Sequence, residues 1–96
     1  MLLLLVVSCS SDTCRTLCAT VAQSIEACLD EWGATWDDFD VSERVEYGDR
    51  CRAEWEKTRT DLEPRQLDGA TEECTDAEFE VPLLTCDQLR ALYFDP

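Results

Sequence analysis

The cysteine content constrains this chain more than any other feature of its sequence. Seven cysteines occur among 96 residues. A single domain of this length buries only about 60–65% of its unfolded surface, so its core needs cross-links, a metal or a partner. Cysteines supply such cross-links in an oxidising compartment. We therefore expect one small domain that disulfides stabilise.

The charge of the chain excludes one class of partner. There are 22 acidic residues against 8 basic ones and no histidine, which gives a net charge of −14. Such a surface repels phosphate backbones, because it offers no cationic stripe that could release counterions. We expect no nucleic-acid partner. The acidity favours solubility, and it also attracts basic proteins, cationic ligands and divalent ions.

The common catalytic constellations are missing from the sequence. Without histidine, Ser-His-Asp and Cys-His sites and most catalytic zinc sites are excluded. Three glycines form no phosphate-binding loop. Adjacent carboxylates such as Asp37-Asp38 and Glu72-Glu73 are expected from acidic density alone. The sequence predicts a protein that is not an enzyme and has no cofactor.

The N-terminal segment carries a sorting pattern. Residues 1–7 are apolar but far too short to span a bilayer, which takes about 20 apolar residues. In Val6-Val7-Ser8-Cys9, a branched apolar residue stands three positions before the cysteine and a small residue directly precedes it. This pattern resembles the lipobox of bacterial lipoproteins, in which the cysteine thiol receives diacylglycerol and the apolar leader is cut away.

The resemblance implies lipidation of Cys9 and a location on the cell envelope, outside the cytoplasm. Residues 1–8 would be the remnant of a signal peptide, 9–12 a lipidated tether and 13–96 the folded domain. Ser10, where aspartate would retain an inner-membrane protein, implies the outer membrane or cell surface. The leader is short and lacks Lys and Arg, which a start codon upstream of Met1 would explain. The alternative is a buried first segment with Cys9 as a core thiol.

If Cys9 carries lipid, the number of remaining cysteines is even and allows three disulfides. These six are Cys14, Cys18, Cys28, Cys51, Cys74 and Cys86. Structural zinc sites use two closely spaced ligand pairs, whereas this chain has one such pair and no histidine. A redox C-x-x-C is also missing. We therefore predict disulfides and no metal.

The segment 13–32 has the clearest helical pattern. Its apolar positions alternate four and three apart, which keeps them on one stripe of a helix. They are Cys14, Cys18, Val21, Ile25, Cys28 and Trp32. Asp12 and Thr13 supply capping oxygens, and Gly33 ends the helix.

A second helix is predicted over 43–62, after a connection at 33–42. Ser42 would be its N-cap and Pro64 would end it. Its inward stripe would comprise Val45, Gly48, Cys51, Trp55, Thr58 and Leu62.

The remainder predicts a third helix over 76–94, interrupted near Pro82. A polar loop is expected at 64–73, and the pairs Thr75/Glu78 and Thr85/Gln88 have the spacing of capping boxes. No run alternates with a period of two, so strands are not expected. The predicted fold is an all-α, disulfide-stapled three-helix bundle running up-down-up.

Six cysteines allow 15 pairings. The arrangement of helices in the predicted bundle favours some of these pairings over others. A hairpin turning near residue 37 places Cys51 opposite the middle of the first helix and Cys74 near its start. We predict the pairs Cys14–Cys74, Cys18–Cys51 and Cys28–Cys86. The C-x₉-C spacing of Cys18 and Cys28 is similar to half of a twin C-x₉-C hairpin of the mitochondrial intermembrane space. The second pair is C-x₁₁-C, so we interpret the match as shared helical geometry.

Two aromatic residues of the connection are the candidate binding residues. Trp36 and Phe39 either form an exposed recognition patch or cover the open end of the bundle, and we favour covering. Trp32 and Trp55 are expected in the core. The aromatic residues of the tail at 93–94 could likewise be exposed or cover the bundle.

A set of residues resembling a calcium-binding loop is better explained by capping and solvation, because Glu43 stands where the loop needs glycine. That set is Asp38, Asp40, Ser42, Glu46 and Asp49.

These observations predict a non-enzymatic, envelope-anchored lipoprotein that binds another protein or has a structural role. Two alternatives stay open. One is a carrier of a small ligand or cation, and the other is a secreted helical effector or inhibitor that lacks the lipid.

Overall fold

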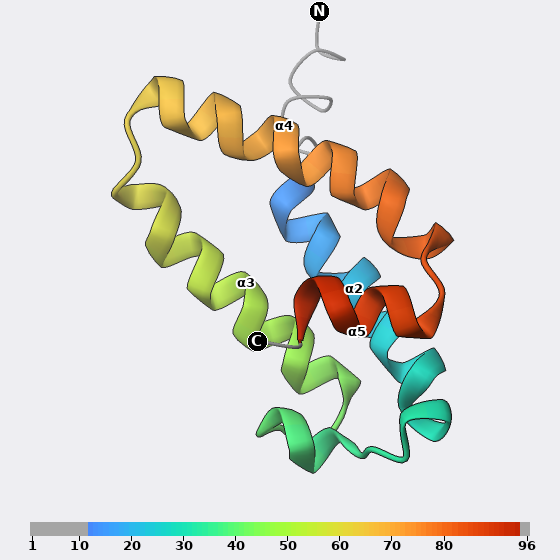
Figure 1. Cartoon of the computed structure of the whole chain (residues 1–96). Coiled ribbons are helices and arrows are strands. Elements are labelled where there is room, and N and C mark those ends of the chain that lie inside the picture. Colours follow the sequence, from blue (N-terminus) through green and yellow to red (C-terminus); the bar gives the residue numbers. More distant parts are fainter. Residues whose placement is uncertain (1–11, 95–96) are drawn as a thin grey trace, which may run out of the picture.

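The structure is a computed structural model that describes residues 12–94, and every regular element in this range is a helix. Figure 1 shows the order of these elements along the chain. They are α2 (Thr13–Trp32), η1 (Trp36–Phe39), α3 (Arg44–Thr60), α4 (Pro64–Glu80), η2 (Val81–Leu83) and α5 (Cys86–Tyr93).

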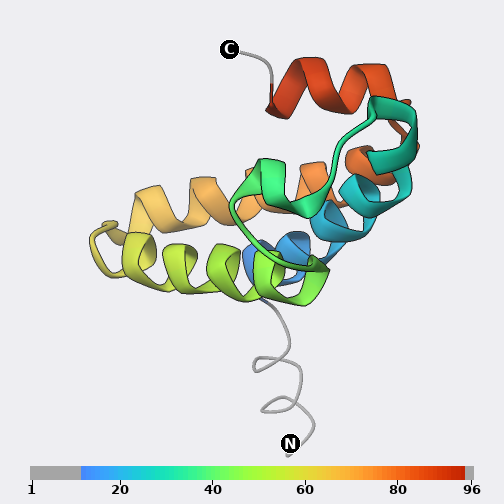
Figure 2. The ribbon, with the colours of Figure 1, turned by 90° about the horizontal axis from the view of Figure 1, so that it is seen from below.

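Helix α2 is the hub of the arrangement, because it contacts α3, α4, η2 and α5. Helices α3 and α4 diverge from the turn that joins them, and α5 lies across α2 (Figures 1 and 2). The molecule measures 49 × 27 × 24 Å along its principal axes. It is therefore an open, elongated assembly built around one helix.

The predicted bounds of α2 are confirmed. The Asp12 carboxylate accepts a hydrogen bond from the Arg15 backbone N–H at 3.3 Å, and Gly33 ends the helix in the left-handed conformation with φ 65°. Thr13 does not cap the helix. Its hydroxyl donates to the Thr71 carbonyl of α4 at 3.2 Å, so it links two helices.

Helix α3 agrees with the prediction in its extent but differs in its cap and its buried face. The N-cap is Glu43, and the backbone N–H and hydroxyl of Ser42 both donate to Glu46 at 2.8 Å. Gly48 is buried as expected, whereas Val45 is 54% exposed and Thr58 is also exposed. Fewer residues of α3 are therefore covered than the predicted inward stripe contains.

The prediction of a polar loop at 64–73 is wrong, because these residues form the first half of α4. Pro64 occupies the first turn, where the missing N–H leaves no bond unmade, and thus starts a helix. The Glu63 N–H donates to Gln66 at 2.9 Å in a capping box. Thr75 lies within the helix and donates to the Thr71 carbonyl at 2.9 Å, so it caps nothing.

The break near Pro82 is confirmed. Helix α4 passes into η2, and Leu84 is extended before α5 begins. The predicted capping box of Thr85 and Gln88 is present, with bonds of 2.9 and 3.1 Å. The described residues therefore contain four α-helices, so the all-α class is confirmed while the three-helix count is not.

The three disulfides have the predicted pairing. They join Cys14 to Cys74, Cys18 to Cys51 and Cys28 to Cys86, with Cα–Cα distances of 5.0, 5.7 and 5.6 Å. Each one fastens α2 to another helix. The buried apolar residues are Cys14, Cys18, Ala22, Ile25, Cys28, Val41, Val81 and Leu89. Three of these eight residues are cysteines, so the cross-links form part of the core.

Candidate functional site

The two candidate binding residues, Trp36 and Phe39, belong to an aromatic cluster at the end of α2. Phe39 lies at its centre, with ring centroids 5.9 Å from Trp36, 5.3 Å from Phe94, 6.2 Å from Tyr47 and 6.5 Å from Trp32. Trp36 and Phe39 are both half-buried. They cover this end of the helix assembly and still present part of their rings to solvent.

Four elements bring these rings together, and the sequence indicated only some of them. Trp32 comes from the last turn of α2, and its indole N–H donates to the Cys86 carbonyl at 3.2 Å. Phe94 follows α5, and its ring meets Trp32 edge-on at 6.1 Å. Tyr47 was missed because it lies on a helix whose polar pattern gave no sign of an aromatic neighbour.

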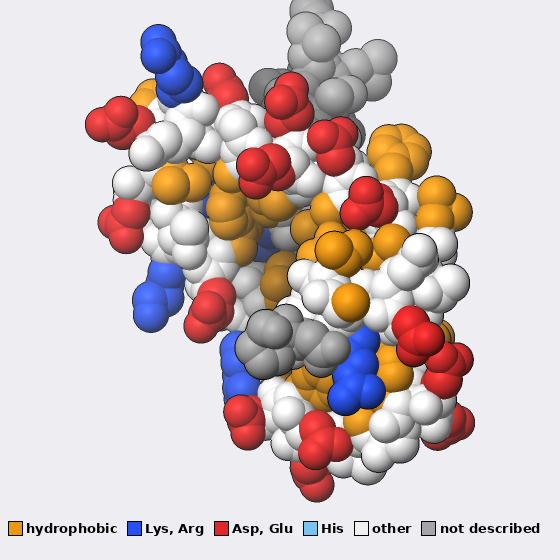
Figure 3. Space-filling view, viewed as in Figure 1, with side chains coloured by type: hydrophobic (Ala, Val, Ile, Leu, Met, Phe, Trp, Pro, Cys, Tyr) orange, Lys and Arg blue, Asp and Glu red, His pale blue; other side chains and the backbone are white. Residues whose placement is uncertain are grey.

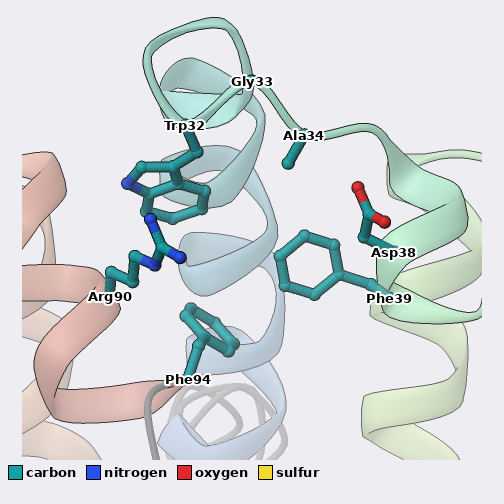
Figure 4. Close-up of a pocket in the computed structure, with 7 residues that line it drawn as sticks. All are labelled: Trp32, Gly33, Ala34, Asp38, Phe39, Arg90 and Phe94. Atoms are coloured by element: carbon teal, nitrogen blue, oxygen red, sulfur yellow. The ribbon is translucent and has the colours of Figure 1, made fainter.

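A cavity of about 370 Å³ opens beside this cluster. Its lining consists of Trp32, Gly33, Ala34, Asp38, Phe39, Arg90 and Phe94. Figure 4 shows the Arg90 guanidinium beside the Trp32 ring, with Phe39 and Phe94 facing one another below. The volume lies within the range of about 300–1,000 Å³ that is typical of small-molecule sites.

The lining of this cavity is rich in aromatic surface. Three aromatic side chains, those of Trp32, Phe39 and Phe94, offer surfaces for stacking. The Asp38 carboxylate accepts the Thr35 backbone N–H at 2.9 Å and so caps η1. The cavity can therefore hold a flat apolar group.

The residues that resemble a calcium-binding loop serve as caps and ion-pair partners. Glu46 accepts both Ser42 bonds, and the Ser42 backbone and hydroxyl hydrogen bonds lower the pKa of Glu46. Asp49 pairs with Arg52 one turn along α3. Within residues 12–94, no group of three or more potential ligand side chains is placed to hold a metal ion.

Cys9, the predicted lipidation site, lies outside the described residues, as do the predicted signal remnant and most of the tether. None of the helices in the described part of the chain is long and apolar enough to cross a membrane.

A second surface lies on α4, and the sequence interpretation missed it. The exposed residues of this helix and of η2 include Phe79, which is 76% exposed, and Leu83, which is 82% exposed. Acidic residues precede them at helical spacing. This helical spacing could have indicated the surface from the sequence. It was missed because residues 64–73 were predicted to form a loop.

Comparison with known proteins does not place the chain in a family. No family model matches it, and neither the curated proteins nor the solved structures contain a significant match. The function must therefore be argued from the residues and their arrangement.

Proposed function

We propose that this protein is a non-enzymatic lipoprotein of the bacterial cell envelope, anchored through Cys9, whose helical domain binds another protein. The observation that carries the proposal is the pairing of six of the seven cysteines in three disulfides. That pairing uses every cysteine of residues 12–94, so none of them is left to pair with Cys9. The Val6-Val7-Ser8-Cys9 pattern supplies a use for this cysteine.

Export is supported by the disulfides. Disulfides persist in oxidising compartments and are rare in reducing ones. Here they lie within the core and join α2 to α3, α4 and α5, so the domain depends on them. A protein built this way fits the space outside the cytoplasm, at the outer membrane or the cell surface.

A binding role is supported by what the domain exposes. Large apolar side chains that are exposed close together can mark a contact with another protein. Phe79 and Leu83 are largely exposed on α4 and η2, and the aromatic cluster around Phe39 is partly accessible. A structural role in the envelope would use the same anchor and the same surfaces.

The mass of the intact protein from its native host tests this proposal. The protein is alkylated with and without prior reduction. We expect two or three acyl chains on Cys9, and six cysteines that are alkylated only after reduction. A Cys9→Ser variant should leave the membrane fraction. A chain without lipid and with seven free thiols would contradict both anchoring and export.

The same mass measurement distinguishes the anchored lipoprotein from a secreted protein. An unlipidated chain with three intact disulfides, recovered from the culture medium, would indicate a secreted effector or inhibitor. In that case Cys9 would have been removed with the leader or would remain unmodified.

The cavity of about 370 Å³ favours a second candidate function, a carrier of a small ligand. Its aromatic faces suit a flat molecule that can stack on them. Native mass spectrometry of protein purified from its host should then show an adduct, and Phe94→Ala should abolish it. A chain without any adduct, and with tryptophan fluorescence unchanged by organic extraction, would argue against the carrier function.

A further inference from the structure

One face of α4 and η2 combines exposed acidic and exposed apolar side chains, and we call it the α4 face. Its six members are all exposed: Glu72, Glu73, Asp76, Phe79, Glu80 and Leu83. Their spacing of three and four residues places them on a single helical stripe about 16 Å long. In Figure 3, which has the viewpoint of Figure 1, acidic side chains lie along the course of α4 and hydrophobic side chains protrude where the helix ends.

The apolar end of this face is held rigidly. Phe79 and Leu83 stand four residues apart, and Val81 between them is 1% exposed and packs with Cys28 and Leu89. The disulfides of Cys74 and Cys86 bracket the segment. The two exposed side chains are therefore presented outward from a fixed support, which lowers the entropy that a partner must overcome.

The acidic part of the face has no cationic partner among residues 12–94. The ion pairs there join acids of α2, α3 and Asp12 to arginines, for example Glu26 to Arg44 at 3.1 Å and Glu56 to Arg15 at 2.6 Å. None of them uses an acidic residue of α4. Residues 61–87 hold nine acidic residues and one basic residue. Positive charge from outside the chain would complement this face.

We propose that the α4 face binds a cationic, amphipathic segment of another protein. Lysine or arginine side chains would pair with the four carboxylates, and an apolar side chain would pack against Phe79 and Leu83. This inference rests on the proposed protein-binding role and names the surface and the partner chemistry. A metal ion fits less well, because the described acids are not gathered into a ligand cluster. An anionic bilayer would be repelled by the carboxylates.

The test uses the folded, oxidised chain and a defined probe. The probe is a 14-residue fluorescent peptide of lysine and leucine, with leucines spaced three and four apart, and binding is followed by anisotropy. A matched peptide has serine in place of leucine. We expect the leucine peptide to bind at least about tenfold more tightly, and its affinity to fall as sodium chloride screens the charges.

Variants locate the binding surface. Phe79→Ala with Leu83→Ala removes the apolar end. Neutralisation of the acids uses Glu72→Gln, Glu73→Gln, Asp76→Asn and Glu80→Gln. Each set should weaken binding by about tenfold or more, since several exposed charge pairs or two apolar contacts are lost. The control removes four other exposed charges through Asp30→Asn, Glu31→Gln, Glu43→Gln and Glu54→Gln, and we expect less than a threefold change. Circular dichroism and the thiol count verify the fold of each variant.

Three outcomes would overturn the inference. Equal weakening by both neutralised sets would show a general charge effect, and an unchanged affinity in the Phe79/Leu83 variant would remove the apolar contact. Binding to phosphatidylcholine vesicles in place of the peptide, lost in the same variant, would make the face a membrane contact. The mass measurement of Cys9 is independent of all these results, so a failure here would leave the anchored location standing.

Discussion

The backbone at Gly33 adopts a conformation that glycine accepts far more readily than other residues, with φ 65° at the end of α2. A Cβ atom there would meet nothing within 4 Å. The cost of Gly33→Ala is therefore purely conformational, and we expect the free energy of unfolding to fall by about 1–2 kcal/mol. Urea unfolding of the oxidised chain measures it.

Gly69 is the matched control for this substitution. It lies in the middle of α4, has a helical backbone, and also has open space where an added methyl group would lie. Gly69→Ala should raise the free energy of unfolding by about 0.5–1 kcal/mol. The same sign of change at both glycines would contradict the left-handed cap.

Asp12 combines capping with a link to α3. Its carboxylate accepts the Arg15 N–H, the Trp55 indole N–H at 3.2 Å and the Arg59 guanidinium at 3.1 Å. Asp12→Ala should lower the free energy of unfolding by about 1–2 kcal/mol, because it leaves a half-buried indole N–H and a helix end without an acceptor. Asp12→Asn keeps an acceptor and should cost less. Urea unfolding followed by tryptophan fluorescence compares them, and equal losses would contradict the capping role.

Tyr47 offers a pH-dependent observable in the aromatic cluster. Burial raises its pKa above the ordinary value of 10.0. Since the folded pKa exceeds the unfolded one, the associated stability is fully present below pH 10 and is lost as the pH rises through the folded pKa. Subtracting the absorbance titration of the Tyr47→Phe variant from that of the native chain isolates the Tyr47 signal. Its midpoint should lie above pH 10. A midpoint at or below 10 would place Tyr47 in solvent.

At the scale of elements, the sequence predicts best those features whose signals lie within one short stretch of the chain. Helix α2 was predicted with its bounds, because a long apolar stripe, a cap and a stop glycine agree. The disulfide pairing followed from the level of each cysteine along α2. In contrast, Pro64 both follows one helix and starts the next, and a proline in sequence indicates only that a helix changes there.

The candidate surfaces depended on tertiary contacts that the sequence does not encode locally. Trp36 and Phe39 could be named from their place in a connection, but Phe94 meets Phe39 through the position of α5, which the Cys28–Cys86 disulfide joins to α2. Likewise, Phe79 is exposed because the opposite side of α4 packs on α2. Apolar spacing alone does not say which side of a helix is covered.

The splayed hairpin of α3 and α4 makes the attachment of α3 testable. Cys18–Cys51 joins α3 to α2 across 33 residues. Replacing both cysteines by alanine should lower the free energy of unfolding by about 3–4 kcal/mol on the chain-entropy estimate. Amide exchange should accelerate most in α3. The matched variant, Cys28→Ala with Cys86→Ala, should accelerate α5 instead, and uniform acceleration in both would contradict the hub arrangement.

In the described residues, disulfides attach α3, α4 and α5 to α2, and the apolar core between these helices is small. Apart from cysteines, the largest fully buried side chains are Ile25, Val81 and Leu89. The net charge of −14 adds self-repulsion that favours expansion. In this fold, disulfides therefore supply stability that a larger apolar core supplies in a longer chain.

It follows that full reduction should unfold the protein at neutral pH. After treatment with a phosphine reductant, we expect the helical circular dichroism at 222 nm to fall by more than half and the cooperative thermal transition to vanish. Added salt should restore part of the helical signal by screening the acidic repulsion. Alkylation of the oxidised chain without reductant is the control and should change neither signal. A reduced chain that still melts cooperatively would show that packing around α2 suffices, and would remove the main physical reason for assigning this fold to an oxidising compartment.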